Sequence, residues 1–297
     1  MMSDFLLNWL INIPGFAAPF AIAALGLIIT ERAGVLNLAA EGFMLAGALA
    51  GVGLMINGAA PLVALGGSMI AAVVLGLVFA VMVASFRINH VISGLALVFF
   101  AEALTSYIAS AERWTNKAIK GLEPILLGQD VIVYATPVLC LLTIWMLNKT
   151  RFGLTLRSVG ENPAAADAAG IDVTATRIAA ILLGAALIGL AGGYLTVAVS
   201  RIWVDSVVGG RGWIAIALVI FARWHPWRAL FGAVLFGCIE ALIPRISAAG
   251  FDVPRYFLQM TPYLATLAVM VWAAARGRDR WSQPAALGQH HIREERG

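Results

Sequence analysis

The chain alternates long apolar segments with short polar ones. Eight apolar segments have spanning length, at residues 13–30, 34–56, 61–86, 91–109, 131–147, 178–199, 227–244 and 256–274. A ninth, 212–222, has about half of the roughly 20 residues that a spanning helix needs, so we interpret it as short, tilted or discontinuous. The pattern predicts an all-α, polytopic membrane protein with eight or nine transmembrane segments.

The composition excludes a soluble domain. Of 297 residues, 61% are hydrophobic and only 12% are charged, and the mean hydropathy is +0.89. So few charged side chains cannot cover a soluble surface of this size. The net charge of +4 does not require nucleic acid, because basic residues on cytoplasmic loops give the same balance. Cys140 and Cys238 each lie in an apolar segment, where buried thiols are more usual than disulfides or metal sites.

Positive charge predicts the orientation. If the loop at 148–177 is cytoplasmic and all nine segments cross, most of the 20 lysines and arginines lie on the cytoplasmic side, Arg32 and Lys149 among them. This bias places the N-terminus outside and the C-terminus inside. We therefore expect a transmembrane domain at 1–275, which includes the cytoplasmic loop, and a polar cytoplasmic tail at 276–297 that is disordered.

A polar stretch at 151–172 interrupts the apolar sequence. Asn162-Pro163 is typical of a helix start, because asparagine caps a helix and proline suits its first turn. The alanines that follow have high helix propensity, and Gly170 can end the helix in the left-handed conformation. This predicts a small-sided helix of about two turns, which is either a docking element or an ordinary solvated loop helix. The docking candidates are Gly160, Glu161, Asn162, Pro163, Ala165, Ala166, Ala169 and Gly170.

Polar residues inside apolar segments are the candidates for a solute path. Asn37 and Glu41 lie in the segment 34–56, and Glu102 lies near the middle of its own segment. A charge at membrane depth costs about 2.5 kcal/mol or more, so both carboxylates should face protein or water. Trp213 could stack on a base or a sugar face. The structural alternatives are that Glu41 bonds to an unwound backbone and that Trp213 is an anchor in the aromatic belt.

The segments 34–56 and 212–222 have related features. Gly47 and Gly51 have the GxxxG spacing that lets helices approach closely, and glycines also loosen the backbone at 209–212. The first segment would enter the membrane from inside and the second from outside. Segments that are short or glycine-interrupted, and that are placed in this way, indicate inverted repeats with a site between them. The inverted repeat is a hypothesis.

Three separated motifs resemble those of one family. The sequence GENP at 160–163 resembles the coupling loop of ABC-importer permeases. The sequences GVLNL at 34–38 and GRGW at 210–213, the latter running into FARW at 221–224, resemble the nucleoside and simple-sugar permeases. That branch belongs to a superfamily that also carries branched-chain amino acids. The resemblance covers nearly the whole chain.

The resemblance implies a function and a set of partners. The chain would be the permease subunit of an ATP-driven importer in the bacterial inner membrane, moving nucleosides or related simple sugars by alternating access. The loop helix would dock into a groove of an ATPase subunit, which carries the ATP and Mg. Further partners would be a second, homologous but different permease chain and a periplasmic or lipid-anchored solute-binding protein. This chain would carry no cofactor, and no nucleic acid would be bound.

Motifs of other activities are missing. The sequence has no GxxxxGK[ST] loop, no HExxH and no GxSxG, so a P-loop ATPase site, a zinc site or a hydrolase site on this chain finds no support. We therefore expect a transport subunit that is not itself an enzyme. The alternative is a stand-alone secondary transporter or channel, in which the intramembrane carboxylates serve as proton or ion sites.

Overall fold

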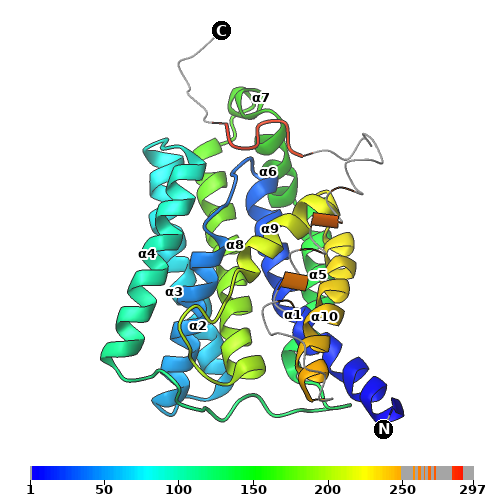
Figure 1. Ribbon diagram of the computed structural model, residues 1–297. Coiled ribbons are helices and arrows are strands. Elements are labelled where there is room, and N and C mark those ends of the chain that lie inside the picture. The colour runs from blue at the N-terminus through cyan, green and yellow to red at the C-terminus, as the bar shows by residue number, and fades with distance from the viewer. Residues whose placement is uncertain are drawn as a thin grey trace.

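The computed structural model describes residues 2–248 and 283–289, together with residues 257, 260, 261, 264, 267, 268 and 271. In this part of the chain all regular secondary structure is helical apart from isolated β-bridges, which confirms the all-α prediction (Figure 1). The helices are α1 (Met2–Arg32), α2 (Ala40–Ile56), α3 (Pro61–Ala80), α4 (His90–Ala111), α5 (Val131–Lys149), α6 (Arg151–Glu161), α7 (Pro163–Ala168), α8 (Val173–Tyr194), α9 (Arg211–Ala222) and α10 (Pro226–Ala248), with π-helical turns η1 (Val81–Ser85) and η2 (Leu195–Ser200).

The chain is a polytopic membrane protein, but the predicted number of spans is not confirmed. Six described helices are long and apolar enough to cross a membrane, and they contain α1, α3, α4, α5, α8 and α10. The segment 34–56 begins with non-helical residues and holds the 17-residue α2, and 212–222 lies in the 12-residue α9. Of the segment 256–274 only isolated positions are described.

Helix α1 lies at the centre of the bundle. It packs against α5, α8 and α10, and it is the most buried of the six long helices. Helices α4 and α5 are the least buried and expose large apolar side chains such as Phe99 and Leu141. Exposed apolar surface of this extent is typical of a face that meets lipid or another membrane protein.

Glycines let α8 approach α1 and α2 closely. A Cβ atom on Gly26 of α1 would lie 2.5 Å from the carbonyl oxygen of Gly184, and one on Gly47 of α2 would overlap the backbone of Gly189. Only glycine permits such contacts between helix backbones. The close approach that the spacing of Gly47 and Gly51 predicts is therefore found, against α8.

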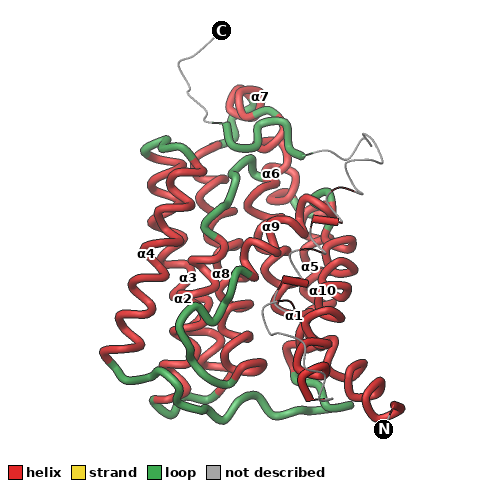
Figure 2. Tube along the Cα trace, viewed as in Figure 1, coloured by secondary structure: helices red, strands yellow, loops and turns green. Residues whose placement is uncertain are grey.

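Two helices begin inside the bundle instead of at one of its ends. After α1, residues 33–39 enter the bundle without helical structure, and α2 starts at Ala40, which is fully buried. After η2, residues 201–210 enter from the opposite end, and α9 then starts at Arg211. Figure 2 shows the two non-helical segments approaching each other from the two ends of the molecule.

One end of the bundle carries α6, α7 and residues 283–289 (Figure 1). The sequence predicted a disordered tail, but residues 283–289 form a bend and turns, with Pro284 and Ala286 buried. Backbone hydrogen bonds to residues far away in the sequence hold this piece of the tail, and no local sequence pattern reports such bonds. The remainder of the predicted tail, 276–282 and 290–297, lies outside the described residues.

Candidate functional site

Helix α7 stands at the tip of the bundle and is built as its sequence predicts. The side chain of Asn162 accepts a hydrogen bond of 2.9 Å from the backbone N–H of Ala165, so it caps the helix. Gly170 has a φ of +84° just after the helix, which is the left-handed conformation that favours glycine. Ala166 is buried against Val159 and Val173. The remaining alanines of this helix and its C-terminal end are exposed, namely Ala164, Ala165, Ala168 and Ala169.

The residues just before α7 contact the end of α1. A Cβ on Gly160 would overlap the carbonyl oxygen of Arg32 and would lie 3.2 Å from the backbone nitrogen of Gly34. Glu161 is exposed, and its Oε2 accepts a hydrogen bond of 3.4 Å from the backbone N–H of Ala285. The coupling-loop candidates are therefore in contact both with the start of the non-helical segment 33–39 and with the tail.

Glu41 joins the two helices that begin inside the bundle. Its side chain is buried, with Oε1 accepting from the backbone N–H of Gly210 at 2.8 Å and Oε2 from that of Gly212 at 2.7 Å. A carboxylate at a helix N-terminus also interacts favourably with the helix dipole. Of the two roles that the sequence suggested for Glu41, this geometry matches the structural one, in which the carboxylate bonds to unwound backbone.

Asn37 also shapes the backbone and does not line an open cavity. It is completely buried, and its Oδ1 accepts a hydrogen bond of 3.1 Å from the backbone N–H of Ala39. Its Nδ2 has no hydrogen-bond partner within the described structure. The backbone of Asn37 bonds to the carboxylate of Glu31, whose Oε2 also accepts from Nε1 of Trp224 at 2.5 Å.

Glu102 lies where α4 packs against the start of α2, since a Cβ on Gly42 would lie 3.2 Å from the Cβ of Ala101. It is exposed near the middle of α4, and its Oε1 accepts a hydrogen bond of 3.0 Å from Oγ of Ser206. Ser206 belongs to the non-helical segment 201–210. An exposed carboxylate halfway along an apolar helix has to face water or another protein chain, because lipid would not solvate it.

Trp213 is half-buried in the first turn of α9. That turn also contains Gly212, which is bonded to Glu41 inside the bundle. Trp213 therefore lies close to the meeting point of α2 and α9 and away from both ends of the bundle, where an aromatic belt would form. Three of the four path candidates thus lie around this meeting point, and Glu102 lies on the neighbouring helix α4, which packs against the start of α2.

The sequence did not predict two interactions inside the bundle, one ion pair and one hydrogen bond. Arg211 Nη2 and Glu240 Oε2 form an ion pair of 2.7 Å between α9 and α10. Glu31 and Trp224 form the buried pair described above. Charged residues inside apolar segments could have indicated that such interactions exist, since an ionisable residue at membrane depth usually has a partner. The identity of the partner depends on the fold.

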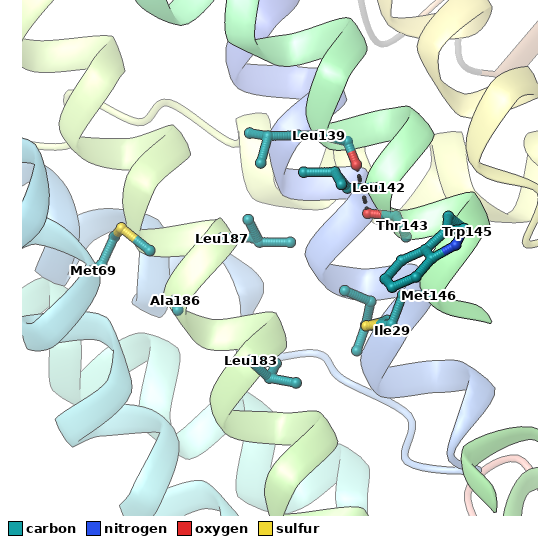
Figure 3. Close-up of a pocket in the computed structure, with 10 residues that line it drawn as sticks. All are labelled: Ile29, Met69, Leu139, Leu142, Thr143, Trp145, Met146, Leu183, Ala186 and Leu187. Atoms are coloured by element: carbon teal, nitrogen blue, oxygen red, sulfur yellow. Dashed lines mark hydrogen bonds between the residues drawn. The ribbon is translucent and has the colours of Figure 1, made fainter. Parts of the chain in front are cut away.

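Two cavities have different chemistry. An apolar pocket of about 320 Å³ lies between α1, α3, α5 and α8 (Figure 3), and its one hydroxyl, that of Thr143, is bonded to the carbonyl oxygen of Leu139. A polar cavity of about 590 Å³ lies near the N-terminal end of α5, and its polar lining is Asn12, Gln129, Asp130, Tyr194, Arg201 and Arg245. Among the residues that the structure describes, no group of three or more His, Cys, Asp or Glu side chains could hold a metal ion.

Comparison with known proteins identifies related transporters. A family model described as "Branched-chain amino acid transport system / permease component" matches residues 9–274. The chain is 34% identical to the putative glucose ABC transporter permease protein TsgC13 of Haloferax volcanii, over 94% of this chain and 95% of that protein. It is 32% identical to the guanosine ABC transporter permease protein NupQ of Bacillus subtilis, over 95% of each chain. It is 33% identical to the nucleoside ABC transporter permease protein NupC of Lactococcus lactis, over 86% and 88%.

Proposed function

This chain belongs to the family of branched-chain amino acid transport system permease components, and we propose that it moves a nucleoside or a related simple sugar in an ATP-driven importer. Members of the family are the transport subunits of ABC transporters, and they carry no ATPase site and no cofactor of their own. The alternative of a stand-alone secondary transporter or channel is therefore dropped.

The substrate class is supported by the relatives and by the polar groups of the path. The names of two relatives specify guanosine and glucose, and a third specifies nucleosides. Ribose and glucose both present hydroxyls, which carboxylates and hydroxyls bind well. Glu102 and Ser206 offer such groups together on one exposed face, and this pair is the observation that carries the proposal. Trp213 would provide the stacking surface.

The path runs along the α4 face that carries Glu102. A second permease subunit, homologous but different, covers this face and encloses the path between the two chains. The carboxylate of Glu102 then faces solute and water at membrane depth, as its charge requires. Asn37 and Glu41 lie behind the path and fix the start of α2 and α9.

The coupling to ATP runs through α7. Its exposed alanines let the surface of an ATPase subunit approach closely, and that subunit carries the ATP and Mg. The end of the molecule with α7 and residues 283–289 is cytoplasmic, and the opposite end receives solute from a solute-binding protein. The membrane is the bacterial inner membrane.

Alternating access uses the two helices that begin inside the bundle. Residues 33–39 with α2, and residues 201–210 with α9, form an inverted repeat whose members meet at Glu41. Short helices that meet within a membrane protein, with non-helical backbone entering from opposite sides, are the elements that open and close a central site in many transporters.

Uptake by the assembled transporter tests this proposal. The full chain, with the ATPase and permease subunits that co-purify with it, is reconstituted in proteoliposomes and assayed with labelled guanosine, ribose and glucose. We expect ATP-dependent uptake of a nucleoside or a sugar, and a loss of about tenfold or more in Glu102→Gln, since a charge-assisted hydrogen bond is worth about 1.5–3 kcal/mol. Glu112→Gln, which changes an exposed carboxylate just after α4, is the matched control. Uptake of none of these solutes would contradict the substrate class, and equal uptake by both variants would contradict the path.

A further inference from the structure

A short piece of the tail joins two segments that the proposed mechanism must move together. We call residues 283–289 the C-terminal strap. The backbone N–H of Ala286 donates a hydrogen bond of 2.9 Å to the carbonyl oxygen of Gly160, and that of Gly288 donates one of 2.9 Å to the carbonyl oxygen of Gly34. Gly160 is in the last turn of α6, immediately before α7, and Gly34 begins the non-helical approach to α2. The strap is therefore bonded both to the end of α6, just before the coupling helix α7, and to the non-helical segment 33–39 that precedes α2.

The strap is tightly packed at this junction. Ala286 is 3% exposed, and Leu287 packs against the main hydrophobic core. A Cβ on Gly34 would lie 3.1 Å from the carbonyl oxygen of Ala286 and 3.4 Å from Cα of Gly160. Gly34 also has a φ of +83°, so both its conformation and its surroundings favour glycine. The backbones of Gly34, Gly160 and Ala286 therefore meet at a point where a larger side chain on Gly34 has no room.

A third bond ties the strap to a docking candidate. The backbone N–H of Ala285 lies 3.4 Å from Oε2 of Glu161, the residue on which α6 ends. Gly160 in addition touches the carbonyl group of Arg32 at the end of α1. A displacement of α7 would therefore reach the end of α1 and Gly34 by direct contact with Gly160, and the strap adds hydrogen bonds that hold Gly160 and Gly34 together.

We propose that the C-terminal strap is a positioning element for energy coupling. It holds the end of α6 and Gly34 as one rigid unit, so that a movement of α7 is passed along residues 33–39 to Glu41 and from there to α9. This inference rests on the proposed function. Packed backbone with long-range hydrogen bonds is the kind of contiguous network that can carry such a displacement.

The first test compares two neighbouring alanines of the strap. Ala286→Gln places a larger side chain in the buried position, whereas Ala285→Gln makes the same change at the exposed neighbour. In proteoliposomes that contain the assembled transporter, we measure solute uptake and ATP hydrolysis together. We expect Ala286→Gln to lower the amount of solute taken up per ATP hydrolysed by about fivefold or more, since energetic coupling between two sites is typically worth at least about fivefold. The ATPase subunit should remain bound to this variant. Ala285→Gln should match the unmodified protein, because this position is exposed and its bond to Glu161 uses the backbone N–H, which the substitution keeps.

The outcomes separate this inference from the proposed function. If the unmodified chain binds no ATPase subunit and takes up no solute, the proposed function fails. If the unmodified chain transports and Ala286→Gln has the same ratio of uptake to ATP as Ala285→Gln, the strap does not couple and the inference is overturned.

A cross-link between two partly buried positions gives a second, independent test. The Cβ of Leu36 and an ideal Cβ on Gly288 are 3.8 Å apart, which is a usual distance in disulfides. Leu36→Cys with Gly288→Cys, in a chain whose Cys140 and Cys238 are replaced by alanine, should form a disulfide on oxidation and keep the uptake of its reduced form. Failure to cross-link would refute the contact. Loss of uptake on oxidation, restored by reduction, would show that the strap must detach and would refute its role as a rigid connection.

Discussion

The carboxylate of Glu41, in the first turn of α2, accepts a hydrogen bond of 2.7 Å from the backbone N–H of Gly212, in the first turn of α9. Its other oxygen accepts from Gly210 at 2.8 Å, so one side chain of α2 satisfies two backbone N–H groups at the start of α9. Unpaired backbone groups away from water are costly, and the first N–H groups of any helix lack partners within that helix. Glu41 thereby makes it possible for α9 to begin inside a membrane protein.

Glu41→Gln should destabilise the protein. The amide keeps one acceptor oxygen but turns an NH₂ group toward a backbone N–H, which removes one charge-assisted bond and creates a repulsive contact. We expect a loss of about 2–3 kcal/mol, measured as a lower unfolding temperature in detergent. Glu102→Gln is the control, because that carboxylate is exposed and its bonded partner is a hydroxyl that can also donate to an amide oxygen. Equal unfolding temperatures for the two variants would contradict the structural role of Glu41.

Gly212→Ala should disrupt the same contact sterically. The added Cβ would lie 2.5 Å from the backbone nitrogen of Glu41, a distance that requires the two helix starts to move apart. Overpacking of this kind costs about 1–3 kcal/mol. Gly66→Ala is a matched control in α3, since a Cβ there has nothing within 4 Å. The measurement is the difference in unfolding temperature, and a Gly212→Ala protein as stable as Gly66→Ala would refute the contact.

Arg211 and Glu240 should show strong energetic coupling. Their ion pair of 2.7 Å is mostly sheltered, with side chains that are 23% and 11% exposed. Removal of one partner leaves the other charge unpaired, which costs about 3–5 kcal/mol when fully buried and less here. We expect Arg211→Met and Glu240→Gln each to lower stability, and the double variant to lose less than the sum. A double-mutant cycle measures this, and additive losses would show that the pair contributes nothing.

The sequence predicts those features that depend on neighbouring residues. Asn162 and Gly170 mark the two ends of α7 because capping and left-handed termination are local effects. Glu41 could be recognised as a buried carboxylate, since charge in an apolar segment requires a partner. The partner could not be recognised, because Gly210 follows 169 residues later and offers only its backbone.

Two differences from prediction have a common physical cause. Residues 33–39 are apolar enough to pass for the start of a helix, yet Asn37 and Gly34 hold them in a non-helical path. The strap contains Pro284 and Gly288, which interrupt regular structure, yet its N–H groups bond to Gly160 and Gly34. In both places backbone conformation depends on tertiary contacts, and hydrophobic periodicity contains no information about them.

Co-purification of an ATPase subunit tests the coupling role of α7 most directly. The full chain is solubilised in detergent and captured, either unmodified or with Ala165→Glu plus Ala169→Glu, which place two charges on exposed positions of the loop helix. The control carries the same two charges at the other end of the molecule, as Ala111→Glu plus Ala118→Glu, both exposed positions. We predict that the unmodified chain and the control retain the ATPase subunit and that the α7 variant loses it while remaining folded. Retention of the subunit by the α7 variant, or its absence from the unmodified chain, would contradict the account.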